Sequence, residues 1–238
     1  MLILKIDIFI SGTILSLIGL GIITSVIFQW KLRQSVRKLP EGWEKPISMK
    51  HFQLGVFFLC LFVTGGFITE IVSEYLARQK IYNSFVFSID FTVTTLFLFG
   101  FLFIHTQKSW KRYSYFLLYA IIVTYLIQGG YYDPDCVLSG DSSLVIFSIY
   151  FLAALLHLTD LLLVPKSIYF DFQLKINLTL LVYSLVSVIL TSFYWAKTTT
   201  MDSTLSDFIF YIYALNIGLF YLSITAIFTH EILKLRRG

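Results

Sequence analysis

Ionisable side chains inside long apolar segments are the residues of this sequence best suited to chemistry. Glu70 and Glu74 lie in one such segment, Asp90 lies in the next, and His157 and Asp160 lie in a later one. A charged side chain at the centre of a bilayer costs about 2.5 to 3.5 kcal/mol on insertion scales, so its presence there indicates a function or a specific partner. These five residues are therefore the first candidates for a functional site.

Glu70, Glu74 and Asp90 predict an outward-facing acidic pocket in the outer half of the membrane. At a rise of about 1.5 Å per residue, Glu70 and Asp90 lie about 9 Å below the same end of two consecutive antiparallel helices. Glu74 follows Glu70 by one helical turn on the same face, and Gln128 and Asn216 supply further polar groups at this depth. We expect a pocket for a small cationic ligand or an ion, or a carboxyl that holds a proton. In the alternative interpretation, the carboxylates only bond neighbouring hydroxyl groups and hold the helices together.

His157 and Asp160 predict a second polar site, in the opposite half of the membrane. They follow Tyr150, Ala153 and Ala154 along one helical stripe, at a spacing that allows His157 and Asp160 to form a hydrogen bond. A charged carboxylate is costly in lipid, so this stripe should face the interior of the bundle. A histidine beside a carboxylate suits a pH-responsive switch or a proton relay. A purely structural contact between helices is the other interpretation.

Common catalytic and metal-binding motifs are missing from the sequence. It contains no HExxH, GxSxG or CxxC motif and no glycine-rich phosphate loop, and its four histidines are widely spaced. Only His157 is deep within an apolar segment. The sequence therefore predicts no metal site and identifies no cofactor.

The composition shows which elements must position these residues. The chain is 57% hydrophobic, 18% aromatic and only 13% charged, and its mean hydropathy is +0.80. Soluble domains carry about 25% charged residues, so the chain predicts an integral membrane protein in contact with the lipid bilayer and not a nucleic-acid-binding protein. Backbone groups in lipid must bond within their own segment, which favours helices.

Seven segments are long and apolar enough to cross a membrane as helices. We therefore predict an all-α polytopic membrane protein, a seven-transmembrane-helix bundle that forms a single domain over residues 1–238. The predicted spans cover approximately residues 8–29, 52–76, 84–104, 113–131, 144–164, 176–196 and 208–229.

The distribution of basic residues predicts the orientation. Fourteen of the 18 lysines and arginines fall in alternate connections or near the C-terminus, and the positive-inside rule places that side in the cytoplasm. The N-terminus is then outside and the C-terminus inside, in a plasma or inner membrane. The fourteen residues are Lys31, Arg33, Arg37, Lys38, Lys45, Lys50, Lys108, Lys111, Arg112, Lys166, Lys175, Lys234, Arg236 and Arg237.

Three functions fit these features. The first is a sensor, a receptor-like protein or a membrane partner subunit. It would signal through a cytoplasmic or membrane partner chain, because the basic tail after the last predicted span is too short to be an effector. The second is a small transporter or channel for ions or protons, which would need a continuous polar path from Glu70 to Asp160. The third is an intramembrane enzyme, which would need His157 close to a second histidine or carboxylate.

Overall fold

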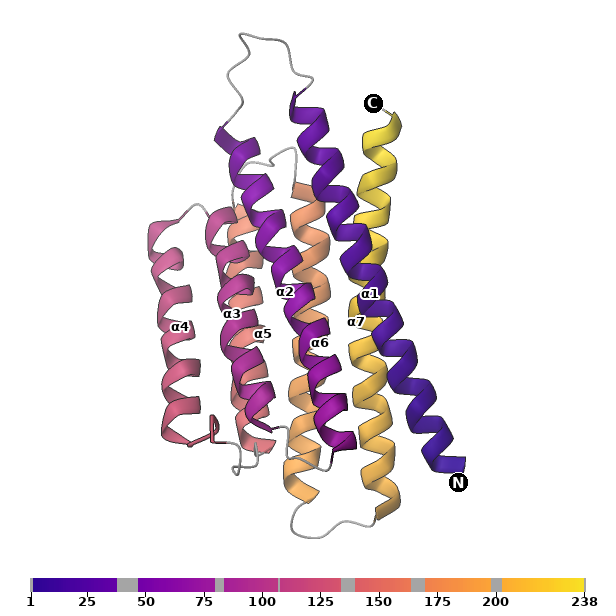
Figure 1. Cartoon of the computed structure of the whole chain (residues 1–238). Helices are drawn as coiled ribbons and strands as arrows, with labels where there is room; N and C mark the ends of the chain where they lie inside the picture. The colour runs from indigo at the N-terminus through magenta and orange to yellow at the C-terminus, as the bar shows by residue number, and fades with distance from the viewer. Residues whose placement is uncertain are drawn as a thin grey trace.

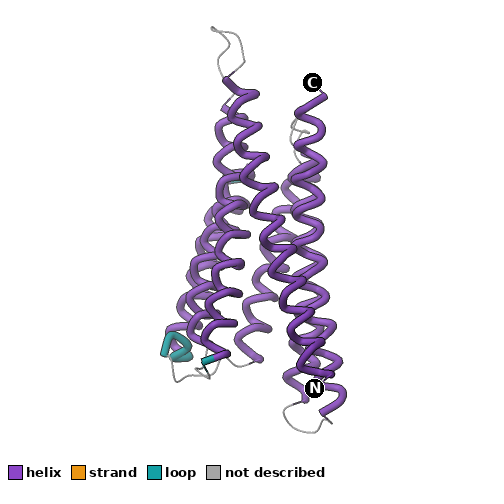
Figure 2. Tube along the Cα trace, turned by 45° about the vertical axis from the view of Figure 1, so that its right-hand side comes forward, coloured by secondary structure: helices purple, strands orange, loops and turns teal. Residues whose placement is uncertain are grey.

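The computed structural model describes residues 2–37, 47–79, 84–106, 108–133, 140–163, 170–197 and 203–237. These residues form seven helices that run side by side, and no strand occurs among them (Figure 1). The N-terminal end of the first helix and the C-terminal end of the last lie at opposite ends of the bundle (Figure 2). The helices are α1 (Leu2–Arg37), α2 (Ile47–Arg78), α3 (Ser84–His105), α4 (Ser109–Gln128), α5 (Gly140–Leu163), α6 (Phe170–Lys197) and α7 (Ser203–Arg237).

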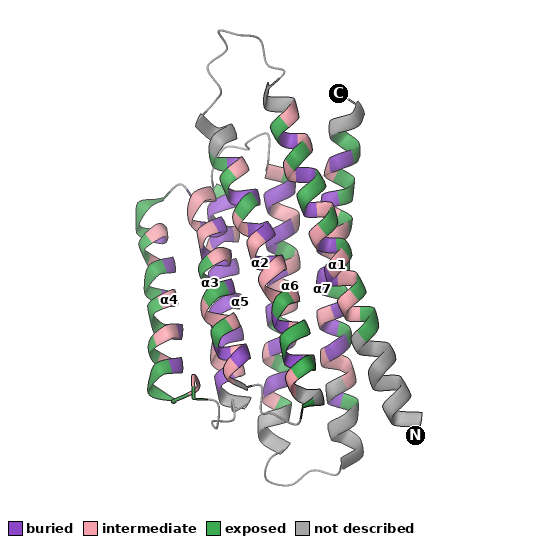
Figure 3. Ribbon diagram, in the orientation of Figure 1, coloured by how far each residue is buried: buried purple, intermediate pink, exposed green. Residues whose placement is uncertain are grey.

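Six of these helices, all but α4, are long and apolar enough to cross a membrane. Large apolar residues are exposed on every helix, as expected of a surface in contact with lipid. Figure 3 colours the helices by burial, with exposed positions in green. The predicted all-helical fold is therefore confirmed, and six apolar helices support the predicted membrane protein. α4 has 20 residues and lies beside α3, but its first turns carry charged and hydroxyl side chains that lower its hydropathy.

The helices extend beyond the predicted spans at several points. α1 continues to Arg37 and α2 begins at Ile47, so much of the predicted connection between Trp30 and His51 is helical. Lysine, arginine, leucine and glutamine favour helices, but only apolar residues mark a span. α4, in contrast, ends at Gln128, three residues before the predicted limit, and Gly130 follows with a φ of +68°.

Packing is closest within the pairs α1 with α7, α2 with α3, and α5 with α6, while α4 lies at the edge against α3 and α5. Small residues permit some of these approaches. A Cβ at Gly55 would collide with the imidazole of His105, so this glycine lets the α3 histidine lie against the α2 backbone. The fully buried core includes Ile18, Val56, Phe101, Leu102, Ile122, Ala153 and Phe228.

Candidate functional site

Glu70 on α2 and Asp90 on α3 line the same cavity, which has a volume of about 260 Å³. Residues from α1, α5, α6 and α7 complete its wall. Glu70 precedes the end of α2 by eight residues and Asp90 follows the start of α3 by six, so both lie roughly 9 to 12 Å from the same end of the bundle. The aromatic side chains of the wall are Phe87, Phe91, Phe147, Tyr183, Tyr213 and Tyr221.

Two adjacent glycines of α2 bring α3 and α7 close to this cavity. A Cβ at Gly66 would collide with the hydroxyl of Tyr221, so the absence of a side chain there admits the α7 tyrosine. A Cβ at Gly65 would lie 2.6 Å from the Cγ2 of Thr94 on α3. The two glycines of α2 therefore allow the close approach of Thr94 and Tyr221 beside the cavity.

Hydroxyl-bearing residues of α2, α3 and α5 lie near Asp90. The Asp90 carboxylate accepts a hydrogen bond from Thr69, the residue before Glu70 on α2. One turn along α3, Thr94 donates to the Asp90 carbonyl oxygen at 2.7 Å, and the hydroxyls of Thr95 and Tyr150 lie 2.6 Å apart. Asp90 thus has the kind of hydroxyl partner that the structural interpretation expected, and it also lines a cavity.

The chemistry of this cavity favours a positive charge. Two carboxylates on its wall create a negative potential, which attracts a cation or a proton. Aromatic rings attract organic cations through their negative faces. Tyr213 also bonds Tyr183, and this contact joins the α6 and α7 parts of the wall.

Two of the other residues predicted for this pocket, Gln128 and Asn216, lie elsewhere. The side chain of Glu74 lies outside the described residues. Gln128 is exposed at the end of α4, which is at the edge of the bundle. Asn216 is buried against α6, where its amide donates to the Ser187 hydroxyl at 3.0 Å and to the Tyr183 carbonyl at 3.3 Å. The structure therefore does not bring Gln128 or Asn216 into the cavity. Residues at a similar depth on two helices can still point in different directions.

His157 and Asp160 are both buried between helices, but each has a different partner. The Nδ1 of His157 lies 3.2 Å from the Oδ1 of Asn177 on α6, whose Nδ2 donates to the Ala154 carbonyl at 3.0 Å. The Oδ1 of Asp160 lies 3.6 Å from the Nζ of Lys111 on α4. Residues three apart on a helix point about 60° apart, so His157 meets α6 and Asp160 meets α4, in place of the predicted mutual bond.

Lys111 also belongs to the site of His157 and Asp160, and it was not predicted from the sequence. It was assigned to a basic connection, yet it lies in the first turn of α4 and is only 2% exposed. Its Nζ donates to the Thr159 hydroxyl at 2.8 Å and to the Leu156 carbonyl at 3.2 Å. A buried Asp160 needs an opposite charge at its own depth. A lysine at the start of the next-door helix α4 meets this requirement, so the sequence did contain a signal for Lys111.

Apolar side chains of α3 and α5 lie between the Glu70–Asp90 cavity and the site of His157 and Asp160. Tyr150 and Thr95 mark the inner limit of the polar groups around Asp90, and His157 follows Tyr150 by about 10 Å along α5. The core residues at intermediate depth are fully or almost fully buried. On α3 and α5 they are Leu98 and Ala153.

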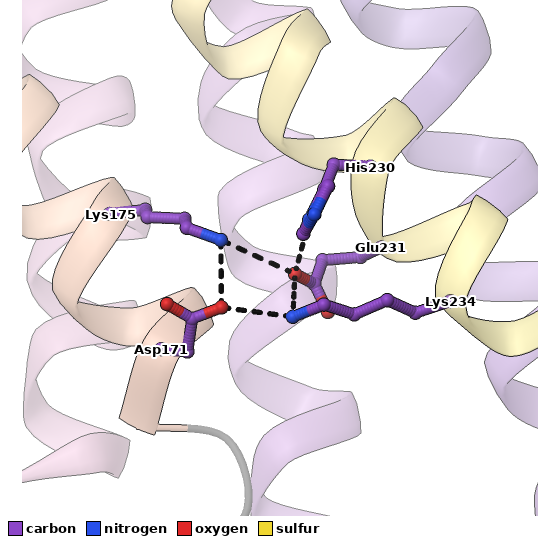
Figure 4. Close-up of polar contacts among 5 residues, drawn as sticks. All are labelled: Asp171, Lys175, His230, Glu231 and Lys234. Atoms are coloured by element: carbon purple, nitrogen blue, oxygen red, sulfur yellow. Dashed lines mark hydrogen bonds and ion pairs between the residues drawn. The ribbon is translucent and has the colours of Figure 1, made fainter.

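Charged residues also join α6 and α7 near the end of the bundle that carries the end of α7. Asp171 accepts hydrogen bonds from Lys175 at 2.7 Å and from Lys234 at 2.9 Å, and Glu231 lies 3.1 Å from both Lys234 and His230 (Figure 4). Most of these side chains are exposed, and exposed ion pairs contribute little to stability individually. We assign this cluster a role in helix packing.

Two further observations bear on catalysis and family. Within the described residues, no three or more side chains among histidine, cysteine, aspartate and glutamate are grouped as a metal ion would require. No protein-family model, curated protein or solved structure matches this chain.

Proposed function

We propose that this membrane protein binds a small organic cation in the cavity formed by Glu70 and Asp90, and acts as a receptor-like sensor or as the membrane subunit of a sensing complex. The observation that carries the proposal is the meeting of two carboxylates from adjacent helices with six aromatic rings on one cavity wall. Such a wall suits a methylated or other organic ammonium group, which gains both charge attraction and cation–π contact.

The proposed orientation exposes this cavity to the outer side of the membrane. All seven helices then cross the bilayer, with the N-terminus outside and the C-terminus in the cytoplasm of a cell bounded by a plasma or inner membrane. The basic residues support this orientation. The positions of the two chain ends at opposite ends of the bundle, and the packing of α4 alongside α3, support the odd number of crossings.

The apolar side chains that follow Thr95 on α3 and Tyr150 on α5 favour sensing over transport. A carrier for protons or ions needs polar groups or water along its path, whereas here the buried apolar residues Leu98 of α3 and Ala153 of α5 lie between the levels of Asp90 and His157 along these helices. A ligand that draws α2, α3 and α7 together around the cavity would instead shift the helices, and their inner ends would transmit this shift to a partner chain.

Calorimetric titration of the full chain in nanodiscs tests the proposal, with choline as the probe and 3,3-dimethyl-1-butanol as its neutral isostere. We expect choline to bind and the alcohol to bind at least tenfold more weakly. Asp90→Asn should weaken choline binding by about tenfold, or 1.4 kcal/mol, because it removes a charge from the wall. Asp133→Asn is the matched control, since Asp133 is exposed in the turn after α4.

Three results would contradict this assignment. They are the absence of choline binding, equal binding of the neutral alcohol, and equal losses from Asp90→Asn and Asp133→Asn. The same protein in sealed proteoliposomes separates the sensor from the carrier. Accumulation of labelled choline inside them would replace the sensor with a transporter that uses the same cavity.

A further inference from the structure

A separate groove of about 480 Å³ lies between α3 and α4, with Phe58 of α2 in its wall. Its lining is aliphatic and aromatic, and Leu96 and Phe116 at its sides are exposed. The groove therefore opens toward the surroundings of the bundle, which in a bilayer are acyl chains. Gly100 deepens it, because a Cβ there would lie 3.2 Å from the Phe58 ring.

A positive charge marks the end of this groove that is nearer the start of α4. The rings of Phe103 and Phe116 meet there in a T-shaped contact with centroids 5.3 Å apart. The guanidinium carbon of Arg112 lies 5.5 Å from the Phe103 centroid, and its Nε donates to the Thr106 carbonyl at 2.7 Å. Its remaining N–H groups make no hydrogen bond to any residue that the structure describes, so they can bind an anion.

The neighbouring residues place this charge at the depth of lipid headgroups. Trp110, two residues before Arg112, is 58% exposed, and an exposed indole at a helix end prefers the interfacial region. Lys108 is also exposed just before α4. Lys111, in contrast, is buried in its contact with Asp160 and does not contribute. An apolar groove that ends beside a guanidinium at headgroup depth has the chemical pattern of a phospholipid.

We propose that the α3–α4 groove binds an anionic phospholipid, with its phosphate on Arg112 and one acyl chain along the groove. Arginine suits this role because its planar N–H groups bind phosphate oxygens in pairs. This site is independent of the proposed cation cavity. A second groove with a mainly apolar lining, of about 410 Å³ between α1 and α7, provides an internal comparison.

Native mass spectrometry of the full chain in detergent tests the charge preference. Phosphatidylglycerol and phosphatidylcholine with identical acyl chains are titrated separately. We expect one phosphatidylglycerol to bind about tenfold more tightly than phosphatidylcholine, and Arg112→Gln to remove this preference. Arg33→Gln, which removes an exposed arginine from α1, should retain it. Equal binding of the two lipids, or equal effects of the two substitutions, would overturn the proposal.

A matched pair of substitutions tests the position of the acyl chain. Leu96 lines the α3–α4 groove and is 47% exposed, and Leu222 lines the α1–α7 groove and is 48% exposed. Leu96→Trp should fill the first groove and weaken phosphatidylglycerol binding at least fivefold, whereas Leu222→Trp should not. Equal losses would place the lipid elsewhere. Competition by soluble glycerol phosphate at similar concentrations would reduce the site to a phosphate site without a lipid.

Discussion

Asp90 and Asp160 place the same carboxyl group in two different environments. Asp160 is 2% exposed, and its Oδ1 lies 3.6 Å from the Lys111 ammonium. Asp90 lies on the wall of a cavity and bonds the neutral hydroxyl of Thr69. One carboxylate has a cation supplied by the protein, and the other lines the cavity in which we propose that an organic cation binds. The comparison separates a charge retained for structure from a charge available for binding.

Breaking the Lys111–Asp160 contact should have the largest effect. Asp160→Leu leaves the Lys111 ammonium buried without its opposite charge, and removal of one partner from a buried ion pair typically costs about 3 to 5 kcal/mol. The double variant with Lys111→Met removes both charges and should recover most of that loss. Thermal and chemical unfolding in detergent measures both, and a double variant no more stable than Asp160→Leu alone would show that the pair has no such role.

Gly66→Ala should have the next largest effect, and it acts on the outer cavity. The added methyl group collides with the Tyr221 hydroxyl, while the ring carbon that bears this hydroxyl is 3.5 Å away, at ordinary contact distance. We expect a loss of about 1 to 3 kcal/mol in stability, together with weaker choline binding. Tyr221→Phe removes the colliding atom and should restore both. Failure of this second substitution to restore them would exclude the Tyr221 hydroxyl as the cause.

These two sites show which features are accessible from the sequence. The rise per residue of a helix is constant, so the common depth of Glu70 and Asp90 followed from counting along two consecutive spans. The direction that each side chain faces depends on the neighbours that pack against it. For this reason Asn216 was grouped with the acidic residues by depth, although it faces Ser187 on α6. The same limit concealed Tyr221, which enters through a glycine on another helix.

The inner site was predicted only in part, for a different reason. The burial of His157 and Asp160 followed from the cost of a charge in lipid and from their small neighbours on α5. The partners did not follow, because hydropathy places the start of a span at the first long apolar run. Lys111 precedes that run and was counted as a connection residue, although α4 begins at Ser109.

His157→Gln should have the smallest effect, and it sharpens the comparison within the inner site. The Asn177 amide nitrogen donates to Ala154, so its Oδ1 is an acceptor and the His157 Nδ1 donates to it. A glutamine amide can supply the same donor, and we expect a loss of about 1 kcal/mol or less. His157→Leu, which removes the donor and leaves a buried acceptor, should cost about 1 to 3 kcal/mol in stability.

The pH dependence of thermal stability, measured from about pH 5 to pH 8 where histidine ordinarily titrates, separates a structural role of His157 from a proton-responsive one. Parallel profiles for wild type and His157→Gln indicate a structural hydrogen bond, because glutamine cannot titrate. A pH dependence that is present in wild type and lost in His157→Gln would instead make His157 a proton-responsive residue.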